Sequence, residues 1–202
     1  MEDVNKWNSF IGGNKAALEV IYLKYYDHLL NYGLKLFPDP DFVKDCIQDL
    51  FVKLYSSKKL KPTQHVRSYL LKSIRNIIID KLTRQKLLVS ENEVSFRLPV
   101  EEDELEKNFG SNDEETLMLR KLLYSFDQLS DKQKQILYFR YIQELSHKEI
   151  ADILDINEQS SMNLSSRALA KLRKLVTDKK NQAFIGNDDL KKNLILLCMV
   201  SK

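Results

Sequence analysis

Residues 145–173 read LSHKEIADILDINEQSSMNLSSRALAKLR. Ser146 and Glu149 have the spacing of a capping box, in which each side chain binds the other residue's backbone amide at the start of a helix. Apolar residues then recur at helical spacing as far as the turn at Asp155, and Asn157 is a typical residue for capping the next helix. The stretch therefore predicts a helix-turn-helix.

The second of these helices has an apolar and a polar side. Spacing of three and four residues predicts burial of Ser161, Leu164, Ala168, Leu172 and Leu175. The outward side then carries Asn163, Ser166, Arg167, Ala170, Lys171 and Lys174. Such a helix can enter the major groove of DNA, although an ordinary helical hairpin with a solvated face has the same spacing. Because no positive charge precedes Arg167 in this helix, any binding to DNA has to rest on few residues.

Composition favours an all-α protein. Hydrophobic residues make up 43% of the 202 residues and charged residues 30%, which suits a core covered by long surface helices. Five glycines and four prolines are few for a many-stranded β fold, and no segment alternates long enough to suggest a sheet. No signal sequence is visible, and the apolar run 193–200 is too short to span a bilayer. We therefore expect a cytoplasmic location and no membrane span.

Catalytic and metal chemistry find little support in the sequence. Cys46 and Cys198 lie far apart and the three histidines are scattered, so no metal-ligand spacing appears. Neither a glycine-rich phosphate loop nor a nucleophile–base arrangement is recognisable. We expect no catalytic residue, no metal and no cofactor.

Charge is divided unevenly along the chain. Residues 1–89 hold 15 Lys and Arg against 9 Asp and Glu, and residues 116–202 hold 15 against 10. Residues 90–115 hold 2 against 10, so an acidic strip separates two basic blocks. This pattern suggests two polyanion-binding domains joined by a segment that does not bind polyanions.

Helical periodicity gives the same division. Apolar stripes predict helices over residues 15–37 and 41–54, capped by Asp39 or Asp41, and a third over 65–83. On the third, Tyr69 is assigned to the core side, whereas Arg67, Lys72, Arg75 and Asn76 are assigned outward positions. We predict a helical domain over 1–89, an acidic linker without core residues over 90–115, a helix-turn-helix domain over 116–177, and a C-terminal extension over 178–202. Leu190, Leu194 and Leu197 in that extension can form a short helix that packs on its own chain or on a partner.

Four segments in sequence order resemble the extracytoplasmic-function sigma factors, the smallest members of the bacterial sigma-70 family. They are FIGGNKAALEVIYLKYYDHLLNY, DFVKDCIQDLFVKLY, VRSYLLKSIRNIIIDKLTR and LSDKQKQILYFRYIQELSHKEIADILDI. The resemblance covers about residues 7–88 and 115–176. It implies a non-enzymatic protein that binds core RNA polymerase and directs promoter recognition and strand opening.

The resemblance also implies roles for particular residues. Contacts with the clamp of polymerase subunit β′ are implied for Asp45, Gln48, Asp49 and Phe51, although Phe51 fits a core position equally well. Capture of the −10 element is implied for the basic loop and third helix, through Lys58, Lys59, Leu60, Lys61, Gln64, Lys72, Arg75, Asn76 and Arg84. Reading of the −35 element is implied for His147, Lys148, Met162, Asn163, Ser166, Arg167 and Lys171. Many relatives carry Lys or Arg at the positions of Met162 and Leu164, so this chain departs from them in charge.

Further partners implied by the resemblance are the flap of polymerase subunit β and an anti-sigma factor. The alternative function is a two-domain helix-turn-helix regulator that binds duplex DNA without engaging polymerase. Binding to core polymerase separates the two, because only a sigma factor requires it.

Overall fold

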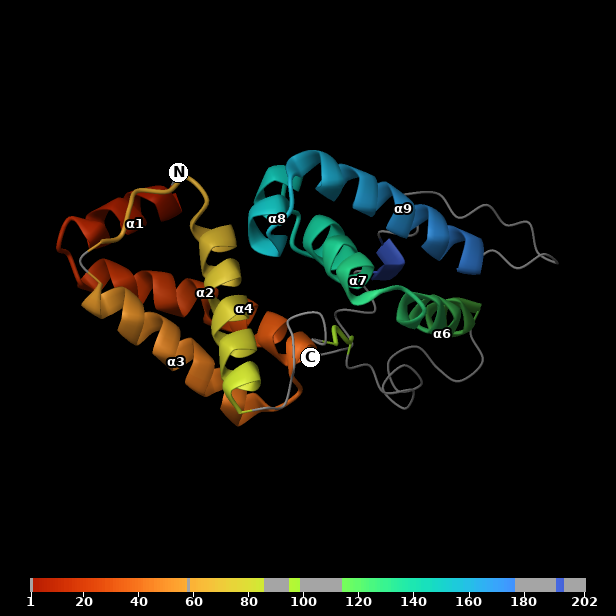
Figure 1. Cartoon of the computed structure of the whole chain (residues 1–202), viewed down its shortest axis with the longest axis horizontal. Helices are drawn as coiled ribbons and strands as arrows, with labels where there is room; N and C mark the ends of the chain where they lie inside the picture. Colours follow the sequence, from red (N-terminus) through yellow and green to blue (C-terminus); the bar gives the residue numbers. More distant parts are fainter. Residues whose placement is uncertain (1, 58, 86–94, 99–113, 177–191, 195–202) are drawn as a thin grey trace. The chain divides into compact units, whose positions relative to one another are not determined.

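The computed structural model describes residues 2–57, 59–85, 95–98, 114–176 and 192–194. Across these ranges the regular elements are helices, which confirms the all-α prediction (Figure 1). The chain forms two compact units, and the sequence passes from one to the other between Ser95 and Phe96. Helices α1 to α4 precede this boundary, and α6 to α9 follow it.

The first unit is built on a helical hairpin. α2 (Ala16–Leu36) is followed by a short turn, and α3 (Pro40–Ser56) packs back against it. Asp39 caps α3, because its carboxylate accepts hydrogen bonds of 3.1 Å from the backbone amides of Asp41 and Phe42. Proline at the first helical position needs no amide partner, so the sequence PDP both ends one helix and starts the next.

The two helices of this hairpin lie close together at Gly33. This glycine is buried, and a Cβ atom in its place would lie 2.4 Å from Cγ1 of Val43, well inside van der Waals contact. Val43 is itself completely buried, and its branched side chain has little freedom to move aside. The missing side chain of Gly33 therefore sets the separation of α2 and α3.

α4 (Val66–Arg84) completes the core of the first unit against α2 and α3. Leu70 and Ile74 are fully buried, as predicted. Two assignments on this helix are wrong: Tyr69 is 37% exposed, whereas Arg75 is only 5% exposed and does not face outward. Buried residues occur nearly all round α4, so spacing alone could not divide it into two sides.

An additional helix, α1 (Glu2–Ile11), packs on α2 and α4. Periodicity did not predict it. Val4, Trp7 and Phe10 follow at three-residue intervals, and the last two are buried. Three positions are too few for a helical period to stand out in the sequence.

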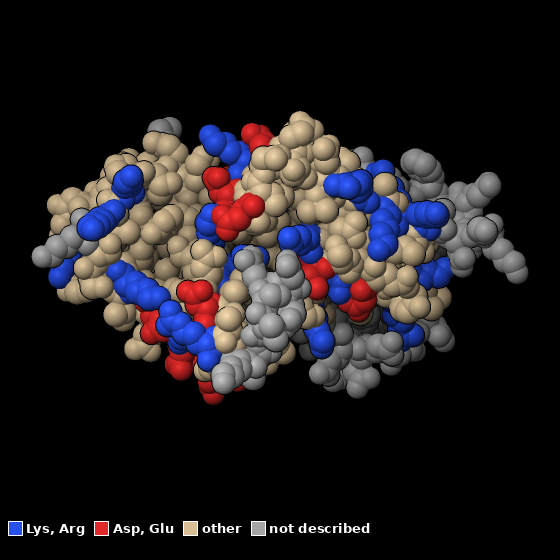
Figure 2. All heavy atoms as spheres, viewed as in Figure 1, with Lys and Arg blue, Asp and Glu red and all other residues tan. Residues whose placement is uncertain are grey.

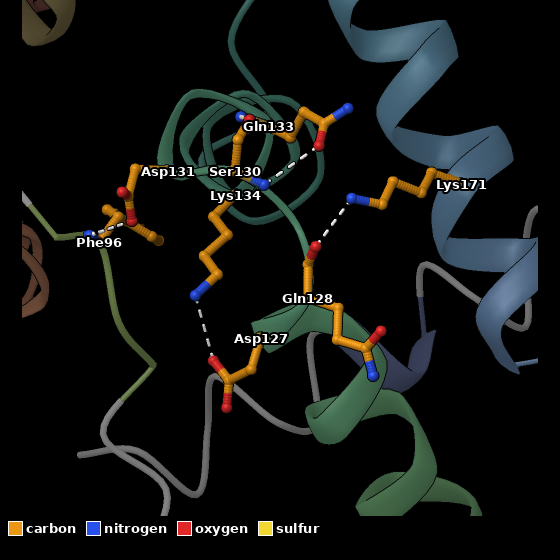
Figure 3. A network of polar contacts seen from close by, with 8 residues as sticks. All are labelled: Phe96, Asp127, Gln128, Ser130, Asp131, Gln133, Lys134 and Lys171. Atoms are coloured by element: carbon orange, nitrogen blue, oxygen red, sulfur yellow. Dashed lines mark hydrogen bonds and ion pairs between the residues drawn. The ribbon is translucent and has the colours of Figure 1, made fainter. Parts of the chain in front are cut away.

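The second unit begins with α6 (Glu114–Asp127), α7 (Asp131–Leu137) and a single π-helical turn, η2 (Tyr138–Ile142). Ser130 and Gln133 form a capping box at the start of α7 (Figure 3). Lys134 reaches back from α7 to Asp127 at 3.2 Å, so the turn between the two helices is fixed from both sides (Figure 3).

Part of the predicted linker belongs to the core. The backbone amide of Phe96 donates a 2.8 Å hydrogen bond to the Asp131 carboxylate (Figure 3). The centre of the Phe96 ring lies 5.4 Å from that of the Tyr138 ring. Phe96 is fully buried and Leu98 is 6% exposed, so the expectation of a linker without core residues is wrong at both positions. Two apolar residues within an acidic strip produce no periodic signal. Residues 86–94 and 99–113 lie outside the described part of the chain, as does most of the C-terminal extension, in which Leu194 is 2% exposed.

The helix-turn-helix is formed by α8 (His147–Leu154) and α9 (Glu158–Val176). The predicted capping box is confirmed: the amides of Ser146 and Glu149 donate to each other's side chains at 3.0 and 3.3 Å. Asp155 ends α8 in the left-handed conformation, at φ 50°, and Asn157 then accepts from the amide of Ser160 at 2.7 Å.

Burial along α9 differs in part from the prediction. Its buried residues are Ser161, Ser165, Ala168, Leu172 and Val176. Leu175 is 36% exposed and Leu164 is half-buried, so assigning both to the core side was wrong. The predicted burial of Ser161, Ala168 and Leu172 is confirmed, whereas Ser165 was missed. One serine of each pair faces the core and the other, Ser160 or Ser166, lies further out.

Replacing Gly33 by alanine tests the close packing of α2 and α3. Alanine favours a helix by about 1 kcal/mol over glycine, whereas overpacking a core costs about 1–3 kcal/mol. Because Val43 yields little, we expect Gly33→Ala to lower the free energy of unfolding by about 1 kcal/mol, measured by urea denaturation with circular dichroism. In a Val43→Ala background the nearest remaining atom is Cδ1 of Ile78 at 3.3 Å, the end of a flexible side chain, so the same change should become stabilising. Destabilisation of equal size in both backgrounds would contradict this explanation.

Candidate partner and nucleic-acid interfaces

A groove of about 560 Å³ lies between α2 and α3 on the first unit. Its walls are formed by Lys15, Leu18, Glu19, Tyr22 and Tyr26 on one side, and by Lys44, Asp45, Gln48, Phe51, Val52 and Tyr55 on the other. Three of the four residues predicted to bind polymerase therefore line one surface. Asp45 and Gln48 are exposed at the groove, whereas Phe51 is 8% exposed and its ring meets that of Tyr22 edge-on at 4.9 Å.

The groove also exposes apolar side chains that sequence reasoning missed. Val52 and Tyr55 are 58% and 53% exposed, and Tyr22 is 36% exposed. The ammonium group of Lys15 lies 3.9 Å from the centre of the Tyr55 ring. The signal was present in the sequence, because Val52 and Tyr55 are large apolar residues that fall outside the core stripe of α3. An apolar floor with charges of both signs at its rim suits an amphipathic helix of a partner.

Asp49, the fourth predicted residue, has a different setting. Its carboxylate lies 2.7 Å from the ammonium group of Lys81 on α4. The hydrogen bond that Lys81 donates to the Asp49 carboxylate raises the pKa of Lys81 against the opposing effect of burial. Asp49 is half-exposed and does not line the groove, so its contact within the structure ties α3 to α4.

The basic loop between α3 and α4 presents several of the predicted −10 residues. Lys59, Lys61 and Gln64 are exposed and Leu60 is half-buried, whereas Lys58 lies outside the described residues. Short local hydrogen bonds shape the loop: the amide of Lys59 donates to Ser57 Oγ, and that of His65 to Thr63 Oγ1 at 3.1 Å.

The predicted residues of α4 divide into two groups. Asn76 and Arg84 are exposed and Lys72 is half-buried, so all three are accessible to a ligand. Arg75 is not, because it is buried. Tyr69, which sequence reasoning placed in the core, is exposed seven residues before Asn76 and therefore lies on the same side of the helix.

The outward side of α9 carries the predicted −35 residues. Met162, Asn163, Ser166 and Arg167 are all exposed, as predicted. The side-chain amide of Gln159 donates to Asn163 Oδ1 at 3.2 Å, and Nε of Arg167 donates to the Asn163 carbonyl at 3.3 Å. Gln159 was missed, although it stands four residues before Asn163, the interval that brings helical side chains together.

His147 contributes to the fold more than to the charge of the surface. Its Nδ1 lies 3.2 Å from the hydroxyl of Ser161, which is completely buried, and this contact joins α8 to α9. Burial lowers the pKa of His147, and the neighbouring charge of Arg140 lowers it further. The imidazole is therefore mostly neutral at pH 7, whereas Lys148 beside it is exposed.

Positive charge on α9 lies in its C-terminal half. On the face drawn in Figure 2, basic side chains gather over that half of the helix and none covers the first half. Lys171 is exposed, but its ammonium group donates a 2.8 Å hydrogen bond to the backbone carbonyl of Gln128 (Figure 3). This residue, predicted as a DNA contact, therefore also fixes α9 to the turn between α6 and α7.

Two further findings concern the described residues only. None of their helices is long and apolar enough to cross a membrane. Among their His, Cys, Asp and Glu side chains, no group of three or more is placed to hold a metal ion. Cys46 is buried, and that burial raises the pKa of its thiol to about 11.

Comparison with known proteins gives matches in both units. Residues 21–87 match the family description "Sigma-70 region 2", and residues 119–172 match "Sigma-70, region 4". The chain is 26% identical over 174 residues to RNA polymerase sigma factor YlaC of Bacillus subtilis, a match covering 84% of this chain and 97% of that protein. It is 22% identical over 162 residues to ECF RNA polymerase sigma factor SigM of the same organism, covering 79% and 94% respectively.

Lys171 and Lys174 allow structural and electrostatic roles on α9 to be separated. We expect Lys171→Ala to lower the free energy of unfolding by about 0.5–1 kcal/mol, because the exposed hydrogen bond to Gln128 is lost. Lys174→Ala, which removes the same charge from an exposed position nearby, should change it by less than about 0.5 kcal/mol. Thermal unfolding of both variants, followed by circular dichroism, measures the difference. Equal stabilities would show that the Lys171 contact contributes nothing.

Proposed function

This chain is an RNA polymerase sigma factor of the sigma-70 family, in its extracytoplasmic-function group, and we propose that its two helical units divide the contacts of transcription initiation between them. In this proposal the region of residues 1–89 binds core polymerase and the −10 element, and that of residues 116–177 binds the −35 element. The protein acts by binding and not as an enzyme. In this proposal it acts in the cytoplasm, where the polymerase also acts.

The groove between α2 and α3 is proposed as the docking surface for the clamp of polymerase subunit β′. The observation that carries this proposal is the exposure of Val52 and Tyr55 beside Asp45 and Gln48. Exposure of large apolar side chains to water is unfavourable, so a cluster of them on the surface favours burial against a partner. Phe51 supports the floor of the groove from below, and Asp49 holds α3 in place through Lys81.

The loop and the exposed side of α4 are proposed to hold the opened −10 strand. Lys59 and Lys61 offer cations for phosphates, and Asn76 offers an amide that can hydrogen-bond to a base edge. Tyr69 adds an exposed aromatic ring on the Asn76 side of α4, suited to stacking on an unpaired base. Arg75 is left out of this proposal because it is buried.

The outward side of α9 is proposed to read the −35 element in the major groove. Asn163 and Arg167 have side chains that can recognise adenine and guanine edges, and Ser166 stands between them. Because positive charge is confined to the second half of α9 on the face in view, phosphate contacts are few and binding to duplex alone should be weak (Figure 2).

Two more partners are proposed. Leu117 and Tyr124 are 51% and 72% exposed and stand seven residues apart on α6, so they form one apolar side that suits the flap of polymerase subunit β. An anti-sigma factor is proposed to compete with polymerase by covering the groove between α2 and α3. The C-terminal extension, which the sequence predicted to pack on its own chain or on a partner, is described only at residues 192–194.

Substituting Val52 tests the polymerase-binding groove. We expect Val52→Glu to weaken binding of the full chain to core polymerase by more than about tenfold, because a charge would be buried without a partner. Val20→Glu is the matched control, since Val20 is 42% exposed on α2 but does not line the groove. Binding is measured by fluorescence anisotropy, and run-off transcription from genomic fragments measures function.

Three results would overturn these assignments separately. Equal core affinity of the two variants would remove the groove from the interface. Run-off transcription that never depends on the chain would contradict a role in initiation. Specific duplex binding without any core binding would favour the alternative of a helix-turn-helix regulator.

A further inference from the structure

Trp7 makes a long-range contact with the basic loop. Its indole Nε1 donates a 3.0 Å hydrogen bond to the backbone carbonyl of Lys61, 54 positions later in the sequence. Trp7 is 1% exposed and is the one tryptophan of the sequence. It stands on α1, which lies before the residues 21–87 that match sigma-70 region 2.

The carbonyl that Trp7 binds belongs to a chemically unusual peptide. Pro62 follows Lys61, so this peptide has no N–H group and offers only its carbonyl oxygen. The proline ring also holds Lys61 away from helical geometry. The stiff segment at the middle of the loop is thus attached to α1 through the carbonyl of Lys61. The hydrogen bonds at Ser57 and Thr63, by contrast, are local: they shape the loop but do not attach it to another element.

The indole is held firmly on its other sides. Its ring meets the ring of Tyr69, at the start of α4, edge-on at 5.1 Å, and that of Phe10 at 5.9 Å. The first turn of α1 is fixed as well, because the Asp3 carboxylate accepts hydrogen bonds from Lys24 and from the Tyr25 hydroxyl on α2. Trp7 therefore connects α1, the loop and the exposed ring of Tyr69.

We propose that Trp7 is a positioning residue for −10 recognition, and that α1 is a clasp that holds the loop in its strand-binding shape. This inference rests on the proposed function of the loop. A loop ordered before binding loses less conformational entropy when the strand arrives, so the clasp favours recognition of the correct sequence. Trp7 itself touches no DNA in this proposal, because it is buried.

Trp7→Phe removes the indole N–H and keeps an aromatic ring. The fold should tolerate the change, because Lys61 is exposed and water can take over the hydrogen bond to its carbonyl. Phe10→Leu is the matched control: it disturbs the packing of α1 next to Trp7 but leaves the bond to the loop intact.

The experiment uses the full chain assembled with core polymerase. The probe is a forked DNA whose single-stranded non-template overhang is randomised, and sequencing of bound against unbound DNA gives the preference for each sequence. We expect Trp7→Phe to reduce the ratio of the binding affinity for the best overhang sequence to that for the average sequence by about fivefold, the effect of one lost hydrogen bond. Core affinity should stay within about twofold of wild type for Trp7→Phe, and Phe10→Leu should keep the wild-type preference even though it unfolds more easily.

The possible outcomes separate the clasp from the function on which it rests. If wild-type holoenzyme has no sequence preference in the overhang, the proposed role of the loop is wrong, and so is the proposal that α1 is a clasp for it. If wild type has a preference and Trp7→Phe retains it in full, the loop's role stands and the clasp is refuted. Loss of preference in both Trp7→Phe and Phe10→Leu would also refute it, because general loosening of α1 would then explain the result.

Discussion

The separation of α2 and α3, set by Gly33 against Val43, is the constraint on which the proposed polymerase surface depends. Two helices that lie this close bury their facing residues and leave the flanking ones to form a groove. Phe51 and Tyr22 meet across that groove, and Val52 and Tyr55 remain uncovered above it. Because α2 and α3 are rigid helices, their close approach at Gly33 limits how far apart they can lie at the groove.

The serine pairs of α9 are explained by their division between two sides of the helix. Ser161 and Ser165 are buried, where small residues let a helix approach its neighbours, and Ser161 is also joined to His147. Ser166 and Asn163 remain outside. A helix that looks unsuited to DNA by its charge is therefore well formed by its packing, and in the proposed reading of the −35 element its low charge leaves discrimination to a few polar side chains.

Sequence reasoning succeeded where a signal is local or repeated. Capping at Ser146 and Glu149 needs only neighbours in sequence, and the apolar stripes of α2 and α3 repeat over many turns.

Sequence reasoning failed where burial is decided by distant segments. Nothing near Arg75 or Phe96 indicates that each is buried. The contacts of Trp7 with Lys61 and of Lys171 with Gln128 join residues 54 and 43 positions apart, beyond the reach of any periodicity. Residue roles implied by the family resemblance remain predictions for the same reason, because they depend on partners that the fold alone does not contain.

The two proposed DNA contacts make different physical demands, and the two units meet them differently. Duplex reading by α9 needs a rigid helix and a few directional side chains, which the fixed turns at Asp155 and Gln128 provide. Strand capture needs a loop that is exposed and yet ordered, a combination that local hydrogen bonds do not achieve. The hydrogen bond from Trp7, which lies outside the loop, meets both needs. It orders the loop backbone, while the side chains of Lys59, Lys61 and Gln64 stay exposed to the strand. With little positive charge at the start of α9, the affinity for a promoter has to be shared, and tethering both units to one polymerase lets two weak contacts act together on one DNA molecule.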